Sequence, residues 1–152
     1  MLHTNLSTNE LGHLSISGAD AVTLAEKYGT PLYVLDEDRV REKCRIYTAA
    51  LRKYFKAGSR PLYASKALSY RGIYAVAKDE GLCVDVVSAG ELYTALKAGF
   101  PAEDIFFHGN NKTPEEIRYA MDSGIGYFVA DNFDELDELG RCAEEKGIRQ
   151  KI

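Results

Sequence analysis

A regular alternation of short apolar segments and helix-like segments runs through the chain from residue 61 onward. The apolar segments predict β-strands at residues 61–65, 83–87, 105–108 and 127–130, with a fifth beginning at 149–152. Their starts are spaced by about 22 residues, which suits a strand, a helix and two short loops. The pattern therefore predicts a repeated strand–helix unit.

Helix-boundary signals fall in the intervals between these strands. Each of four helical stretches ends at a glycine that can adopt a left-handed conformation, namely Gly81, Gly99, Gly124 and Gly147. The run Thr113-Pro-Glu-Glu116 predicts a capping box with proline at the first helical position, and Ser88-Ala-Gly-Glu91 follows the same logic. Asp131 is the expected cap of the helix after the fourth strand.

Strands that alternate with helices indicate parallel pairing through right-handed crossovers. The strand centres, such as Val84–Val86–Val87 and Ile105–Phe106–Phe107, are apolar on both faces, as in a doubly covered parallel sheet. A doubly wound open sheet and a (β/α)8 barrel both fit, and the regular repeat favours the barrel. A complete barrel takes roughly 250 residues. The fold class expected is therefore α/β, the first half of a parallel barrel, truncated after about four units.

The first 60 residues follow a different pattern. We predict a short strand at residues 12–17, a helix at 19–28 that ends at Gly29, and a strand at 31–35. Asp36 then caps a long amphipathic helix that continues to about Phe55. Its apolar stripe is expected to pack in a core; the stripe consists of Val40, Cys44, Tyr47, Ala50, Leu51 and Tyr54.

Composition places the 152-residue chain among globular proteins, because 45% of its residues are hydrophobic and 28% are charged. A net charge of −4 argues against a nucleic-acid partner, and no apolar run reaches membrane-spanning length. The N-terminus lacks the features of a signal peptide. Three widely separated cysteines suggest reduced core residues, so a cytoplasmic location is expected.

Polar groups follow the predicted strands at the edge where barrels and open sheets place their active sites. Lys66 ends the first strand, Asp85 lies near the end of the second, and His108 ends the third. A lysine at the end of a buried strand must be paired or neutralised, and burial favours the neutral amine that forms Schiff bases. A lysine with its head in water is the alternative.

Asp85 could hold this ammonium, and His108 could stack on a planar ligand. Alternatively, Asp85 pairs with a surface cation and His108 is an ordinary loop histidine. Neither has the spacing of a metal ligand, so no metal is expected.

Several motifs together resemble the N-terminal half of the diaminopimelate decarboxylase family, whose members are pyridoxal-phosphate enzymes of the alanine racemase-like fold. These motifs are Gly29-Thr-Pro-Leu-Tyr-Val-Leu-Asp36, Tyr63-Ala-Ser-Lys66-Ala, Asp85-Val-Val-Ser-Ala-Gly-Glu91 and Phe107-His-Gly-Asn-Asn-Lys112. The lysine motif is shared with ornithine and arginine decarboxylases, whereas the run beginning at Phe107 points to the diaminopimelate branch. The resemblance covers essentially the whole chain.

The resemblance implies that Lys66 binds pyridoxal 5'-phosphate covalently and that Asp85 and His108 line the cofactor pocket. It implies that the parent protein converts meso-2,6-diaminopimelate to L-lysine, the last step of lysine biosynthesis, as a homodimer with a small amino acid as substrate. Residues 1–36 would contribute to a β-rich domain, and residues 37–152 would form the N-terminal half of the cofactor-binding barrel. Glu91 would lie near the cofactor.

In that family the phosphate site and the substrate-binding residues lie beyond the equivalent of residue 152, so the chain alone is expected to be inactive. Two alternatives remain open: a decarboxylase of the same fold acting on arginine, ornithine or carboxynorspermidine, and a cofactor-binding fragment without catalysis. An alanine racemase is disfavoured because Leu68-Ser-Tyr-Arg-Gly72 follows the lysine.

Overall fold

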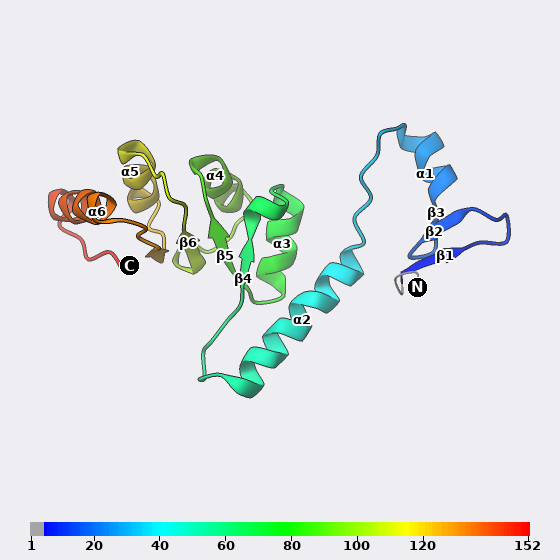
Figure 1. The fold of residues 1–152 in the computed structure, drawn as a ribbon, viewed down its shortest axis with the longest axis horizontal. Helices are drawn as coiled ribbons and strands as arrows, with labels where there is room; N and C mark the ends of the chain where they lie inside the picture. The colour runs from blue at the N-terminus through cyan, green and yellow to red at the C-terminus, as the bar shows by residue number, and fades with distance from the viewer. Residues whose placement is uncertain (1–4) are drawn as a thin grey trace. The chain divides into compact units, whose positions relative to one another are not determined.

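The computed structural model describes residues 5–152, and the chain divides into two compact units, Met1–Lys43 and Cys44–Ile152. The first unit contains an antiparallel sheet in the order β1 (Leu6–Thr8), β2 (Leu14–Ile16), β3 (Ala19–Asp20), followed by α1 (Ala21–Tyr28) (Figure 1). The Asp20 carboxylate accepts the Thr23 N–H at 2.9 Å and so caps α1. The strand predicted at residues 12–17 is confirmed, and α1 begins later than predicted because Ala19–Asp20 pairs with β2.

The strand predicted at residues 31–35 is wrong. These residues have no assigned strand structure, and no strand among residues 5–152 pairs with them. The pattern of apolar residues is therefore present, but a strand forms only where a neighbouring backbone supplies hydrogen bonds.

Helix α2 (Glu37–Tyr54) begins at the predicted cap, since an Asp36 carboxylate oxygen accepts the Arg39 N–H at 3.0 Å. The expectation that its apolar stripe packs in a core is wrong for most of the stripe. Cys44 is buried, but Tyr47 and Tyr54 are 64% and 71% exposed. An amphipathic stripe is buried only where another element packs against it, and little of the described chain covers this one.

The second unit is built on a parallel sheet in the order β4-β5-β6-β7. The strands are β4 (Leu62–Ala64), β5 (Cys83–Val86), β6 (Ile105–Phe107) and β7 (Tyr127–Phe128). The helices that alternate with them are α3 (Arg71–Asp79), α4 (Ala89–Lys97), α5 (Pro114–Asp122) and α6 (Phe133–Lys146). All four predicted strands are present, although each is shorter than predicted. The expected fifth strand is represented by a single parallel bridge between Tyr127 and Lys151.

The helices cover one face of this sheet and leave the other open. The covered face carries the fully buried core, consisting of Val84, Val86, Ile105, Phe107 and Phe128. Ala64, Asp85, Phe106 and Tyr127 lie opposite one another in register and are only partly buried. Phe106 and Tyr127 stack with their ring centroids 4.4 Å apart. The prediction of two covered faces therefore holds for one face only.

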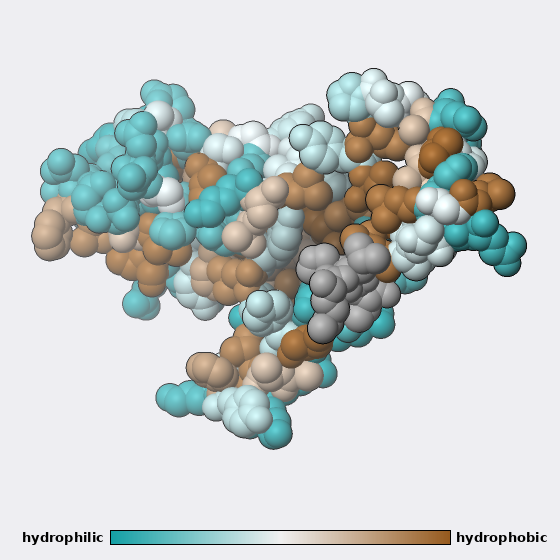
Figure 2. Space-filling model, turned by 45° about the vertical axis from the view of Figure 1, so that its right-hand side comes forward, coloured by the Kyte–Doolittle hydropathy of each residue, from teal (hydrophilic) through white to brown (hydrophobic). Residues whose placement is uncertain are grey.

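Apolar side chains also reach the surface near the end of the sheet. In the view of Figure 2, brown hydrophobic surface lies below the teal hydrophilic surface of this unit. A depression of about 390 Å³ at this edge is lined by Phe106, Tyr127, Phe128, Val129, Ala130 and Ile152.

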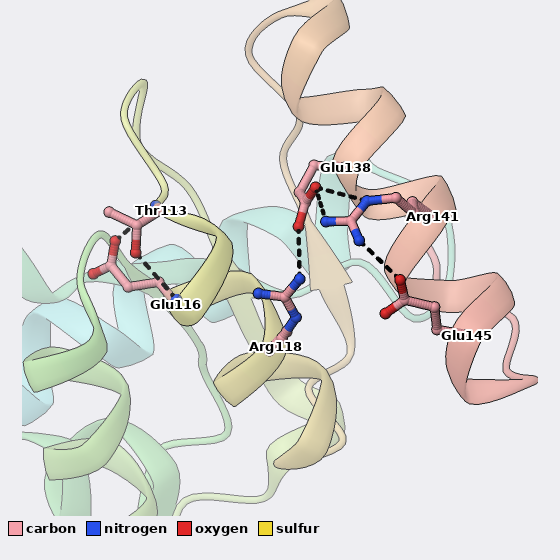
Figure 3. A network of polar contacts seen from close by, with 6 residues as sticks. All are labelled: Thr113, Glu116, Arg118, Glu138, Arg141 and Glu145. Atoms are coloured by element: carbon pink, nitrogen blue, oxygen red, sulfur yellow. Dashed lines mark hydrogen bonds and ion pairs between the residues drawn. The ribbon is translucent and has the colours of Figure 1, made fainter.

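The predicted helix boundaries are largely confirmed. The four predicted terminal glycines all have positive φ, between +63° and +76°. The Thr113 capping box forms completely, with Glu116 N–H donating to Thr113 Oγ1 at 3.2 Å and Thr113 N–H donating to Glu116 Oε2 at 3.1 Å (Figure 3). Asp131, however, does not cap α6. Asn132 does so, its Oδ1 accepting the Glu135 N–H at 2.8 Å, because the helix begins one residue later than predicted.

Ion pairs on the outer surface join neighbouring helices. Glu138 of α6 lies between Arg141 of the same helix and Arg118 of α5, whose nitrogen is 3.6 Å from a Glu138 oxygen (Figure 3). Cys44, Cys83 and Cys142 are buried, as predicted, and none of them is in a disulfide bond. Among the described residues, no helix is both long and apolar enough to cross a membrane.

Candidate functional site

The candidate site lies at the carboxyl ends of β4, β5 and β6, which meet at one edge of the parallel sheet. Lys66 follows β4, Asp85 lies within β5 and His108 follows β6. Ala64, Asp85 and Phe106 are in register on the open face. His108, two positions beyond Phe106, returns to that face, and Lys66 lies in the turn that directly follows β4. The sheet thus brings the three predicted residues to the same edge.

The prediction that Lys66 is buried at the end of a strand is wrong. It lies in a single 3-10 turn, η1 (Ser65–Ala67), after an edge strand, and its side chain is exposed. Within residues 5–152 its ammonium makes no hydrogen bond or ion pair. The physical reason is that β4 is an edge strand with an open face, so nothing in the described chain desolvates the lysine.

The peptide that carries Lys66 is nevertheless firmly held. Ser65 is fully buried, and its hydroxyl lies 2.8 Å from the Asp85 carbonyl oxygen and 2.7 Å from a Glu91 carboxylate oxygen. On the other side, the Tyr63 hydroxyl donates to the Leu68 carbonyl at 2.8 Å. Burial raises the pKa of this tyrosine, which favours the neutral hydroxyl that donates. The lysine therefore projects from a fixed turn.

Glu91 has a role that sequence reasoning missed. Ser88 accepts the Glu91 N–H at 3.3 Å, as a cap should, but the Glu91 carboxylate accepts the Val87 N–H at 2.7 Å instead of completing the box with Ser88. The carboxylate thereby links the end of β5 to Ser65. The serine directly before the lysine was the available signal, because a small hydroxyl residue at a buried turn commonly bonds to a neighbouring backbone or carboxylate.

Asp85 approaches His108 and makes no ion pair with Lys66 in the described residues. One Asp85 carboxylate oxygen is 3.7 Å from His108 Nδ1, and the side chains are 17% and 45% exposed respectively. Burial raises the pKa of the Asp85 carboxyl, while His108 and Lys66 act in the opposite direction. Asp85 therefore lies within ion-pair distance of the imidazole, and the Lys66 ammonium is near enough to lower the pKa of the Asp85 carboxyl. After β7, Asn132 supplies the α6 cap, and neither Asp131 nor Asn132 adds a group to this cluster.

The residues at this edge suit the aldehyde group and the ring of pyridoxal phosphate. An aldehyde needs an accessible amine that no protein group has already engaged, and Lys66 meets this condition. A flat ring needs a planar or apolar neighbour, and the half-exposed imidazole of His108 provides a planar one. Together with the fold, these features define a domain of the (β/α)8-barrel class that presents an exposed lysine at the carboxyl edge of its strands.

Comparison with known proteins makes the assignment specific. Residues 37–152 match the family model described as pyridoxal-dependent decarboxylase, pyridoxal binding domain. The chain belongs to the family of pyridoxal-dependent decarboxylases, whose cofactor is pyridoxal phosphate.

Individual relatives agree with this family. The chain is 50% identical over 148 residues to a diaminopimelate decarboxylase of Bacillus subtilis (strain 168), covering 96% of this chain and 33% of the relative. It is 46% identical over 150 residues to that of Bacillus methanolicus, covering 99% and 34%. The chain thus spans about a third of the length of these curated relatives.

Solved structures confirm the fold. The crystal structure of a diaminopimelate decarboxylase from M. jannaschii superimposes with a TM-score of 0.84 at 34% identity, over 96% of this chain and 34% of that one. A second crystal structure of that enzyme, in complex with L-lysine, gives a TM-score of 0.83 at 34% identity, over 95% and 34%. The expected resemblance and the expected half barrel are both confirmed.

Proposed function

We propose that the whole protein is a pyridoxal-phosphate-dependent carboxy-lyase that converts meso-2,6-diaminopimelate to L-lysine. The observation that carries the proposal is the exposed, unengaged Lys66 amine on a turn that buried hydrogen bonds hold at the carboxyl edge of the sheet. The substrate assignment is supported by the similarity to curated diaminopimelate decarboxylases and by the lysine bound to the M. jannaschii enzyme.

In this proposal Lys66 holds the cofactor, and Asp85 and His108 line its pocket. When bound, pyridoxal phosphate supplies an aldehyde that condenses with amines and a conjugated ring that accepts the electron pair released as carbon dioxide leaves. Lys66 must lose its proton before it can attack as a nucleophile. His108 provides a flat surface for the ring, and Asp85 sets the direction of the imidazole through Nδ1.

The turn around Lys66 contributes by limiting motion. Ser65 and Tyr63 fix the backbone on either side of the lysine. The position of the Lys66 amine therefore varies mainly through the rotamers of its own side chain. Positioning of this kind can supply a large part of a rate enhancement, because a displacement of about 1 Å can cost roughly a hundredfold.

The proposal extends to the setting of the protein. We expect a small amino acid as substrate, a homodimer as the full-length assembly and a cytoplasmic location, the last supported by three buried cysteines that form no disulfide bond. Residues 1–36 are proposed to join a β-rich domain and residues 37–152 the cofactor-binding barrel. The 152-residue chain by itself is expected to release no carbon dioxide.

The test is a substrate panel on the protein expressed from its complete gene and supplied with pyridoxal phosphate. Carbon dioxide and amine products are measured with meso-2,6-diaminopimelate, ornithine, arginine and carboxynorspermidine. We expect release of L-lysine from the first compound alone, loss of activity in Lys66→Ala, and wild-type activity in Lys97→Ala, which changes an exposed lysine on α4. Preference for another substrate, or activity retained in Lys66→Ala, would overturn the proposal.

A further inference from the structure

A second lysine near the site, Lys112, is buried and fully engaged. Its side chain is 1% exposed, and its ammonium donates to the Gly109 carbonyl at 2.6 Å, the Val129 carbonyl at 2.9 Å and a Glu135 carboxylate oxygen at 2.6 Å. An ammonium has three N–H donors, so every donor is used. The Glu135 side chain is 4% exposed.

This arrangement excludes Lys112 from chemistry and gives it a structural task. Burying an unpaired ammonium is strongly unfavourable, and only a close counter-charge and complete hydrogen bonding offset the cost. An ammonium whose three protons are all hydrogen-bonded to protein oxygens has no free electron pair with which to attack a carbonyl group. The two lysines therefore have opposite properties. Lys66, after β4, is exposed and makes no hydrogen bond among the described residues, whereas Lys112, in the loop after β6, is buried and uses all three of its N–H donors.

The ammonium joins three separate segments next to His108. Gly109 directly follows His108, Val129 directly follows β7, and Glu135 lies in the first turn of α6, where the Asn132 cap holds its backbone N–H. Removing the ammonium would leave two carbonyl groups and a carboxylate without their common partner.

The backbone of His108 is fixed on both sides of this junction. His108 N–H donates to the Val86 carbonyl at 2.9 Å, and Val129 N–H donates to the Phe107 carbonyl at 2.9 Å. Gly109 has φ of +106°, and a Cβ placed on it would lie 3.4 Å from the Val87 carbonyl oxygen. The loop therefore packs closely against the end of β5, the strand that carries Asp85.

We propose that Lys112 and Glu135 are positioning residues that hold the loop after β6 so that the His108 imidazole faces Asp85 at the cofactor edge. The proposal rests on the proposed function only where it assigns His108 to the cofactor pocket. The geometry that the pair controls, His108 against Asp85, exists without cofactor and can be measured without it.

The test compares Lys112→Met and Glu135→Gln in the full-length, cofactor-free protein by NMR of the His108 imidazole, assigned with His108→Gln. Lys146→Met is the matched control, because it removes a lysine from a surface ion pair with Asp122. We expect both pair variants to shift and broaden the His108 signals and change their pH titration, while Lys146→Met leaves them unchanged. With cofactor and substrate, kcat should fall by roughly a hundredfold, with a smaller change in KM.

The outcomes separate positioning from stability alone. If His108 signals and titration match wild type in both pair variants, the proposal is overturned even where the variants are less stable. Should Lys112→Met fail to fold, Glu135→Gln decides, because it keeps the shape and an acceptor oxygen and removes only the charge. If Lys66 takes no pyridoxal phosphate, the proposed function falls, whereas the NMR comparison still decides the role of Lys112.

Discussion

The turn that carries Lys66 provides a quantitative prediction through Ser65→Ala. The substitution removes a fully buried hydroxyl that lies between the Asp85 carbonyl and the Glu91 carboxylate. The Glu91 oxygen then keeps the Val87 N–H as its remaining partner. Hydrogen bonds to charged groups contribute about 1.5–3 kcal/mol, so we expect the free energy of unfolding to fall by about 2 kcal/mol, or roughly 30-fold in the ratio of folded to unfolded protein.

The assay is urea unfolding of the full-length protein, combined with the rate at which Lys66 captures pyridoxal phosphate. Ser123→Ala is the control, because the Ser123 hydroxyl donates only to the Tyr119 carbonyl four residues earlier at the end of α5, and its loss should cost under about 0.5 kcal/mol. We expect Ser65→Ala to slow capture several-fold. Equal stability losses in the two variants with an unchanged capture rate would refute the reasoning.

Three further outcomes follow from the fold. Thr113→Ala should lower the free energy of unfolding by about 1 kcal/mol in chemical denaturation because it breaks the α5 capping box, whereas Thr94→Ala, which removes a bond within α4, should have a smaller effect. Phe107→Ala should cost about 3–5 kcal/mol in the same assay, since the ring is fully buried. The raised pKa of Asp85 means that its contribution to stability is present below its ordinary value of 3.8 and is lost as pH rises through the raised value. Unfolding measured across that pH window should show Asp85→Asn gaining stability relative to wild type as pH rises, and a constant difference between the two would contradict this.

Local signals in the sequence predicted the strand–helix repeat well. Strands β5, β6 and β7 each carry buried apolar residues, and each terminal glycine takes the left-handed conformation that its position requires. The Thr113 box is fixed by residues three apart in sequence, so no distant contact can alter it. Such features are readable because their causes are local.

Features that depend on distant partners were predicted less well. Residues 31–35 have the composition of a strand but no partner strand in the described chain. Tyr47 and Tyr54 of α2 lie on a correct amphipathic stripe, yet burial depends on what packs against it. Lys66 was predicted to be buried for the same reason: a strand end is desolvated only when neighbours enclose it, and β4 is an edge strand.

The site residues show the same division. The parallel register made the meeting of Asp85 and His108 predictable. Glu91 was interpreted as a cap because its spacing from Ser88 fits one, but the carboxylate bonds instead to Val87 and to Ser65, which is 26 residues away in sequence. Lys112 lies in a recognisable motif, but its partners Val129 and Glu135 are 17 and 23 residues away in sequence. These bonds could therefore be found only in the three-dimensional structure.

The most direct test of the central claim is chemical trapping of the cofactor. The full-length protein is incubated with pyridoxal phosphate, reduced with borohydride, digested and mapped by mass spectrometry, with Lys66→Ala in parallel. We predict a single stoichiometric adduct on the peptide that contains Lys66 and its loss in the variant. An adduct on Lys112, adducts spread over surface lysines, or equal labelling of the Lys66→Ala protein would contradict it.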